Sequence, residues 1–228
     1  MPKVRFHNMN FKDDIKVLQK SLTRIQKNMP NFKKMANMYF KNPDNKNLIE
    51  FIAENKQHFI GMRDSNSKRI IKNWRKIEKR YFSEVEKITC YKWKFKTYEC
   101  YLSSTFFIGG NYTVDEKHLK PHNTIMVCPY TKHVDPIYVI AHELFHAHTQ
   151  GVISCTNIKL DKNYLKISGP MAEIILKVVF SEIPITGFNR NVYPQYDKIC
   201  QTLKKRWIKD KDFKKLILDT YDLLEKGA

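Results

Sequence analysis

Hydrophobic residues in the first third of the chain recur every three to four positions, the spacing of one face of a helix. The first run ends before Pro30 and contains Ile15, Leu18, Leu22 and Ile25. Three further helices are predicted over 32–40, 44–58 and 64–87, with Gly61 as the break between the last two. Residues 11–87 are therefore expected to be helical.

The hydrophobic period changes from about 3.6 to 2 after Thr89, which indicates β-strands. Apolar residues alternate with lysines over 91–97, so this strand is expected to bury one face and expose a basic one. A second strand is predicted over 103–109, closed by two glycines. A third, more apolar strand is predicted over 124–128 and stops at Pro129.

The clearest helix start in the chain is Asp135-Pro136, where aspartate can cap the free N–H groups and proline suits the first helical position. This helix is predicted to end at Gly151. A loop over 154–167 then leads to a helix over 171–180, opened by Ser168-Gly-Pro. Two terminal helices are predicted over 194–209 and 212–226.

Helices before and after a short block of strands predict a helix-rich α+β fold. We expect a small, mostly antiparallel sheet packed on the helix that begins at Pro136, with helices at both termini. Residues 1–87 are predicted to form a basic helical region that packs on a domain of residues 88–228. Because no glycine-rich linker separates the two, one continuous domain is the alternative.

The chain is strongly basic, with 41 Lys and Arg against 23 acidic residues and a formal charge of +18. Residues 1–87 hold 21 of these cations and 9 of the acids. Such a field favours acidic partners, including nucleic acid, anionic lipid and acidic polypeptides. The alternative is a protein whose helices simply have solvated basic faces, because no known nucleic-acid-binding motif is present.

Cysteine usage and the absence of targeting segments predict a cytoplasmic protein. The five cysteines are an odd number without a C-x-x-C pair, which favours reduced thiols over a disulfide framework. The N-terminus lacks the apolar run of a signal peptide. No stretch approaches the roughly 20 apolar residues of a membrane span.

The helix predicted from Pro136 contains H-E-x-x-H, formed by His142, Glu143 and His146. Four residues turn a helix about 40° past a full turn, so both imidazoles lie on one face and can bind a single Zn²⁺. Glu143 lies about 100° round the helix, where it can accept a proton from a water. The motif therefore predicts a zinc hydrolase site, and two stray histidines on a structural helix are the alternative.

A catalytic zinc normally has three protein ligands, so a third must come from elsewhere. His148 lies about 240° round the helix from His142, and no histidine follows it. A carboxylate must then be the third ligand. Glu173 is the first candidate because its apolar neighbours would bury it, and an unpaired buried glutamate is costly. Glu182 and Asp161 are the alternatives.

The H-E-x-x-H motif and the later Glu173 resemble the gluzincin clan of zinc metallopeptidases, whose familiar member is thermolysin. The resemblance covers about residues 100–182, including Ser168-Gly-Pro-Met-Ala-Glu, which is similar to the family's entry into its glutamate helix. It implies an edge strand, a second strand, the motif helix and then the glutamate helix. Many relatives have an aspartate four residues after the ligand glutamate. Lys177 stands there instead, and is expected to pair with a nearby acid.

The resemblance also implies a mechanism for peptide hydrolysis. Zn²⁺ polarises the scissile carbonyl while Glu143 transfers a water proton to the leaving amine. An extended peptide substrate would pair with the strand over 103–109, which includes Ser103, Thr105, Phe107 and Gly109. A further donor must stabilise the oxyanion, and the candidates are Tyr193, Tyr196 and His133.

A second hypothesis belongs to a different functional class. The basic N-terminal helices would make the chain a nucleic-acid-associated or regulatory protein, in which the zinc site is secondary or structural. A protease recruited to nucleic acid or to an acidic partner by residues 1–87 would combine both.

Overall fold

The computed structural model describes residues 1–28, 48–107, 109–112, 120–131, 134–183 and 194–226, and the side chains of 23–28 and 194 are not among them. The helix predicted over 32–40 and the side chain of Ile25 lie outside the described residues. The elements are β1 (Lys3–Asn8), α1 (Phe11–Asn28), α3 (Leu48–Glu54), α4 (Lys56–Thr89), β2 (Thr97–Leu102), β3 (Gly110–Asn111), β4 (Thr124–Val127), α5 (Pro136–Ile153), α6 (Lys162–Val179), η2 (Phe180–Glu182), η3 (Pro194–Tyr196), α7 (Asp197–Asp210) and α8 (Phe213–Lys226).

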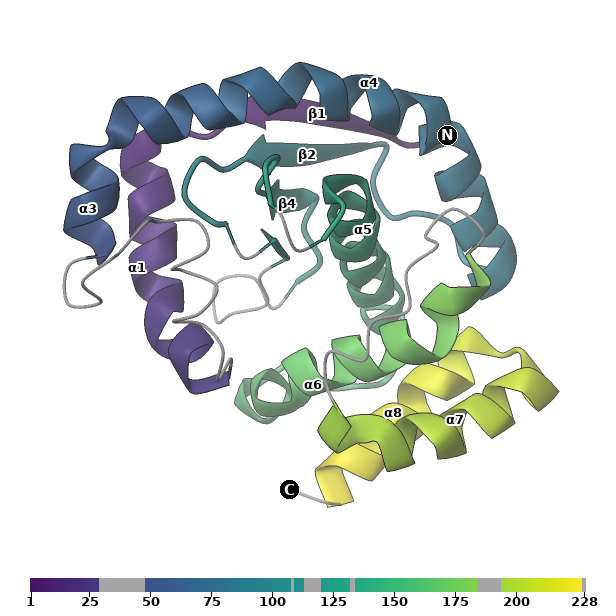
Figure 1. Cartoon of the computed structure of the whole chain (residues 1–228). Coiled ribbons are helices and arrows are strands. Elements are labelled where there is room, and N and C mark those ends of the chain that lie inside the picture. Colours follow the sequence, from purple (N-terminus) through teal and green to yellow (C-terminus); the bar gives the residue numbers. More distant parts are fainter. Residues whose placement is uncertain (29–47, 108, 113–119, 132–133, 184–193, 227–228) are drawn as a thin grey trace.

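The four described strands form one mixed sheet in the order β1-β2-β4-β3. β1 pairs with β2 and β2 with β4 in parallel, and only β3 is antiparallel, to β4. The predicted helix-rich α+β class is confirmed, but the expectation of a mostly antiparallel sheet is wrong. The reason is the long helix α4, which runs beside β1 in Figure 1 and returns the chain for a parallel β2.

Strand β1 was not predicted from the sequence, and its outer side is joined to α4. The N–H of Val4 donates to Glu78 Oε1 (2.7 Å), and Arg75 Nη2 donates to the carbonyl of Val4 (2.7 Å). An open strand edge would otherwise present unpaired backbone groups to other chains. These two α4 side chains therefore satisfy backbone groups at that edge.

The prediction of a strand over 91–97 is wrong, because α4 continues to Thr89 and β2 begins only at Thr97. The alternating burial is nevertheless real, and Trp93 is buried. Its backbone N–H donates to Glu86 Oε1 (3.3 Å) and its indole N–H to the carbonyl of Phe82 (3.1 Å). Bonds to the preceding helix thus replace the ladder bonds of a strand.

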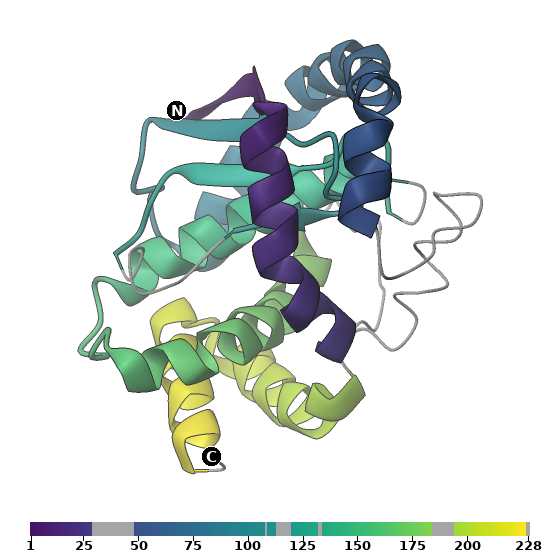
Figure 2. The same ribbon diagram turned by 90° about the vertical axis from the view of Figure 1, so that its left-hand side faces the viewer.

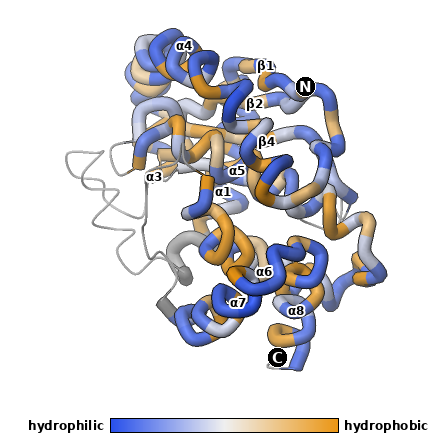
Figure 3. The backbone as a smooth tube through the Cα atoms, turned by 90° about the vertical axis from the view of Figure 1, so that its right-hand side faces the viewer, coloured by the Kyte–Doolittle hydropathy of each residue, from blue (hydrophilic) through white to orange (hydrophobic). Residues whose placement is uncertain are grey.

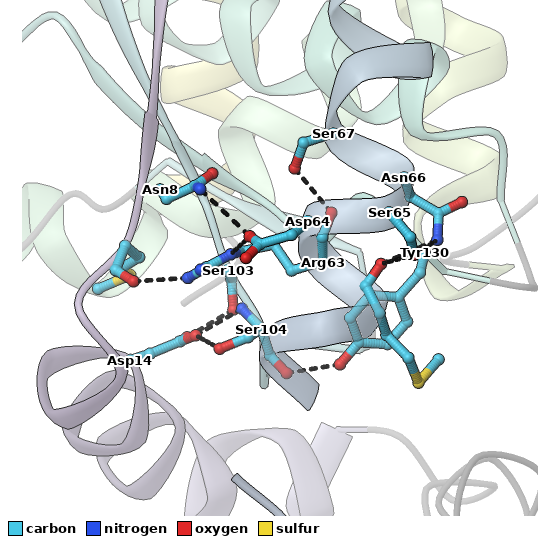
Figure 4. A network of polar contacts seen from close by, with 12 residues as sticks. Asn8, Asp14, Arg63, Asp64, Ser65, Asn66, Ser67, Ser103, Ser104 and Tyr130 are labelled. Carbon is cyan, nitrogen blue, oxygen red and sulfur yellow. Dashed lines mark hydrogen bonds and ion pairs between the residues drawn. The ribbon is translucent and has the colours of Figure 1, made fainter. Parts of the chain in front are cut away.

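The strand predicted over 103–109 is also wrong, because its first residues form a turn around Asp14 of α1. The Asp14 carboxylate accepts hydrogen bonds from Ser103 Oγ (2.5 Å), from the Ser104 backbone N–H (2.5 Å) and from Thr105 Oγ1 (2.8 Å). Figure 4 shows the contacts of Asp14 with both serines. A fully buried carboxylate needs such donors, so the sequence Ser-Ser-Thr serves Asp14 rather than a sheet.

The sheet separates two hydrophobic cores. Ile125 and Val127 of β4 belong to the larger core with α4, α5 and α6, whereas Met126 and Cys128 belong to the smaller core with α1 and α3. Figure 2 shows α1 crossing the sheet on that second side. The larger core contains residues from both predicted domains, and the division at residue 87 stays a prediction.

Helix boundaries differ from expectation at two places. The break between α3 and α4 falls at Asn55, and Gly61 lies inside α4. Helix α6 begins at Lys162, nine residues before the predicted start, because the Asp161 side chain accepts the N–H groups of Asn163 (2.9 Å) and Tyr164 (3.2 Å). The two terminal helices are confirmed as α7 and α8.

No helix in the described segments is both long enough and apolar enough to cross a membrane.

Candidate metal centre

Helix α5 carries both histidines of the motif, and it starts as the sequence predicts. The Asp135 side chain accepts the N–H of Ile137 (2.9 Å), and Pro136 is the first helical residue. The helix ends at Ile153, just past the predicted stop at Gly151. Most of it is buried from Val139 onward, because apolar side chains lie on several of its sides. The histidines are therefore held in a rigid interior helix.

The structure brings His142, His146 and Glu173 together. The Nε2 atoms of the two histidines are 2.9 Å apart. Glu173 Oε1, on the neighbouring helix α6, lies 3.7 Å from Nε2 of His142 and 3.5 Å from Nε2 of His146. Within the described segments this is the one group of three His, Cys, Asp or Glu side chains whose donor atoms could hold a metal ion.

The two alternatives for the carboxylate ligand have other roles. Asp161 caps the start of α6. Glu182 accepts a hydrogen bond from the indole of Trp207 (2.7 Å) and pairs with Lys211 (2.7 Å). Only Glu173, of the three candidates, faces the histidines.

Neighbouring charges shift the pKa values of His142 and Glu173. Burial lowers the pKa of His142, but the hydrogen bond and negative charge of Glu173 outweigh it, so that this pKa lies above its ordinary value. Burial raises the pKa of Glu173, and hydrogen bonds from both histidines outweigh it and hold the pKa well below the ordinary range. The charged form of Glu173 is thus favoured at this place, and a carboxylate that binds a metal ion must be in that form.

Glu143 is the buried carboxyl beside this cluster. Burial raises its pKa, although His142 and His146 act in the opposite direction. The backbone of Tyr112, directly after β3, lies close enough to the carboxylate to lower this pKa. A base with a raised pKa binds a proton more readily, so the site suits proton transfer at Glu143.

The end strand β3 passes unusually close to α5 at Glu143. A Cβ atom on Gly110 would lie 2.6 Å from Val139 Cγ1, 2.8 Å from Glu143 Cγ and 2.9 Å from Glu143 Oε1. These are shorter than ordinary van der Waals contacts, so only a glycine lets the strand approach this far. Nothing in the sequence alone predicted that Gly110 is part of the site.

Comparisons with family models, curated proteins and solved structures gave no match to this chain. A function for this protein must therefore be inferred from its own sequence motif and from the geometry of the site.

The prediction that His148 lies on a different side of α5 from His142 is confirmed. Its Nε2 lies 2.9 Å from Thr89 Oγ1, and its ring stacks on Phe213 on the other side of α5. Burial lowers the pKa of His148 to about 3. It is a neutral core residue that joins α5 to the end of α4.

The expected pairing of Lys177 with a nearby acid is also confirmed, because its ammonium contacts Asp197. Nδ1 of His146 is buried and has no hydrogen-bond partner among the described residues. Metal-binding histidines often donate this ring N–H to a carboxylate, and no described residue accepts it here.

Of the three predicted oxyanion donors, Tyr193 and His133 lie outside the described residues. Tyr196 lies in η3, partly buried against the larger core, and its role stays a prediction. The structure adds Tyr138, one helical turn before His142 on the same side of α5, with ring centroids 5.9 Å apart. Burial and the charges of Glu173 and Glu143 raise the pKa of Tyr138 to about 12. The spacing of four residues between Tyr138 and His142 could have indicated from the sequence that the two side chains lie on the same side of the helix.

Proposed function

We propose that this protein is a zinc-dependent hydrolase that cleaves peptide bonds. The observation that carries the proposal is the convergence of His142, His146 and Glu173 beside the buried Glu143. Two imidazoles and one carboxylate form a ligand set that catalytic zinc sites use. The resemblance to gluzincins adds support from the sequence, with the same three residues as ligands.

The distances between the donor atoms fit a zinc ion. Bonds of about 2.0–2.1 Å in a tetrahedron place neighbouring ligand atoms roughly 3.3 Å apart. The observed separations of 2.9, 3.5 and 3.7 Å bracket that value. Small adjustments of the side chains would bring all three atoms into the first coordination shell.

The number of ligands favours catalysis over a structural role for the metal. Structural zinc sites are usually closed by four protein ligands, whereas catalytic sites have three and an open position. The cluster has three donors among the described residues. This argues against the alternative of a regulatory protein with a merely structural zinc site.

When bound, zinc would lower the pKa of a water and polarise a carbonyl group. Glu143 would accept the water proton and pass it to the leaving amine. Burial keeps the proton affinity of the Glu143 carboxylate high. The phenol of Tyr138, which stays protonated near neutral pH because its pKa is about 12, is our candidate donor to the oxyanion.

An extended peptide would bind along β3 rather than along residues 103–109. β3 is the end strand of the described sheet and lies directly against Glu143. Backbone pairing of a substrate with an end strand gives affinity without demanding a particular sequence. We propose a reducing compartment such as the cytoplasm for this activity, since all five cysteines are unpaired thiols.

The proposal is tested by measuring cleavage of a mixed peptide pool before and after removal of metal. Treatment with a zinc chelator should abolish cleavage, and one equivalent of Zn²⁺ should restore it, because the ligands lie in a folded core that remains intact. Cleavage that continues after metal removal would contradict the proposal. So would a fully zinc-loaded protein that cleaves neither peptides nor denatured proteins.

A further inference from the structure

The outward side of α4 carries a dense group of cations, here called the cationic face: Lys68, Arg69, Lys72, Lys76, Lys79 and Arg80. All six side chains are exposed. Helical geometry places them within roughly 120° of the helix circumference and along about 18 Å of its length. The one acidic residue between Lys68 and Arg80 is Glu78, and it faces β1 instead.

Two other cations of α4, Arg63 and Arg75, have partners inside the molecule, whereas those of the cationic face have almost none. Arg63 binds the carbonyl of Met9 (2.8 Å), and Arg75 binds Glu78 and β1. Within the described part of the chain, Arg69 is the one member of the cationic face with a hydrogen bond, to neutral Asn66 (3.0 Å). The charge of this face is therefore not used to stabilise the fold.

The surroundings of the cationic face disfavour two kinds of partner, a lipid surface and another protein. The large hydrophobic side chains exposed in the described segments are Met1, Tyr101 and Ile208, none of which is on α4. A helix that binds a membrane surface needs an exposed apolar side, so a lipid surface is disfavoured. A protein interface normally has an aromatic or apolar centre and few lysines, and the cationic face has neither property.

Single-stranded nucleic acid is disfavoured by the same observations. Proteins that bind single strands stack the bases on aromatic side chains. The aromatic residues of α4 are all buried in the two cores: Phe59, Trp74, Tyr81 and Phe82. In Figure 3, which views α4 almost end-on, mainly hydrophilic residues lie on its outward side.

We propose that the cationic face binds the phosphate backbone of duplex nucleic acid, without reading its sequence. Duplex DNA carries one charge per about 1.7 Å of axis, so 18 Å presents on the order of ten phosphates to six cations. Lysine contacts to phosphates carry no information about the bases. The proposal is independent of the metal centre, and either one can fail without the other.

The test measures binding of a fluorescent 20-base-pair duplex to the full chain by anisotropy, over a series of salt concentrations. The logarithm of the affinity should fall with the logarithm of salt with a slope of about −5 if all six cations contact phosphates. The triple variant Lys72→Gln, Lys76→Gln and Lys79→Gln should bind roughly tenfold to a hundredfold more weakly at low salt. Its slope should be shallower by about 3.

The matched control removes the same charge from α7, by Lys204→Gln, Lys205→Gln and Lys209→Gln, three exposed lysines away from the cationic face. This variant should bind the duplex as the wild type does. The proposal is overturned if both triple variants weaken binding equally, or if the wild type does not bind the duplex at low salt. Tighter binding to a single strand, to phosphatidylserine vesicles or to polyglutamate than to the duplex would also overturn it.

Discussion

Glu143→Gln is expected to lower the turnover of peptide substrates by roughly 10²–10⁴-fold, the usual contribution of a general base. The substitution keeps the size of this buried side chain and removes its ability to take up a proton. Glu143 is not one of the three converging donors, so zinc content should stay at the wild-type level. The measurements are kcat/KM on a cleaved peptide and the zinc content of the same sample.

The matched control for this variant is Glu54→Gln, the same change at an exposed glutamate at the end of α3. It should have wild-type turnover and zinc content. If Glu143→Gln cleaves peptides as fast as the wild type, Glu143 is not the base and the proposed mechanism is wrong.

Gly110→Ala should reduce turnover by roughly a hundredfold, because a displacement of about 1 Å at catalytic groups has effects of that size. The new methyl group would overlap Val139 and Glu143. Valine in a helix has one strongly preferred rotamer, so Val139 cannot rotate away cheaply. Either β3 retreats or the Glu143 carboxylate moves, and overpacking of this kind also costs about 1–3 kcal/mol of unfolding free energy.

Gly169→Ala provides the control for this prediction. Gly169 lies in α6, four residues before Glu173, and an added Cβ would meet no atom within 4 Å. The change should leave turnover unchanged and raise stability slightly, since alanine favours a helix. Chemical denaturation and steady-state kinetics on both variants check the pair. Equal effects of the two substitutions would show that the contact at Gly110 does not position Glu143.

The parts of the site that the sequence predicted are those determined by local rules. Asp135 caps the first turn of α5, and Pro136 suits its first position, so these two residues determine where the helix starts. The spacing of four residues then places His142 and His146 on the same side of the helix. The exclusion of His148 followed from the same helical geometry. Each of these inferences needs only residues within a few turns of one another.

The parts that were missed depend on contacts between distant segments. The aromatic and apolar residues of the segment 103–109 are typical of a strand. Asp14, about ninety residues away, instead accepts the hydroxyl groups of residues 103–105 and the N–H of Ser104, and so fixes a turn. The parallel pairing of β1 with β2 requires α4 as a crossover, and no local pattern reports it. The approach of Gly110 to Glu143 is likewise visible only once the sheet and α5 are placed together.

Pro170 misled the prediction of α6 for a different reason. Proline is common at the first turn of a helix, so Ser168-Gly-Pro was interpreted as the start. The stronger local signal is the cap at Asp161, and Pro170 lies inside the helix. The segment before it is polar and looks like a loop, although Tyr164 and Ile167 are buried. The position of Glu173 on a helix was therefore predicted correctly from an incorrect boundary.

The most direct test of the account is the zinc content of the purified, zinc-reconstituted protein, measured by elemental analysis. The wild type should hold about one zinc ion per chain, because three donor atoms converge at one point. Glu173→Ala should lose it while its circular dichroism spectrum stays that of a folded protein. Glu182→Ala and Asp161→Ala, which remove the other two candidate carboxylates, should retain it. A folded Glu173→Ala variant that still holds one zinc per chain, or a wild type that holds none, would contradict the metal centre.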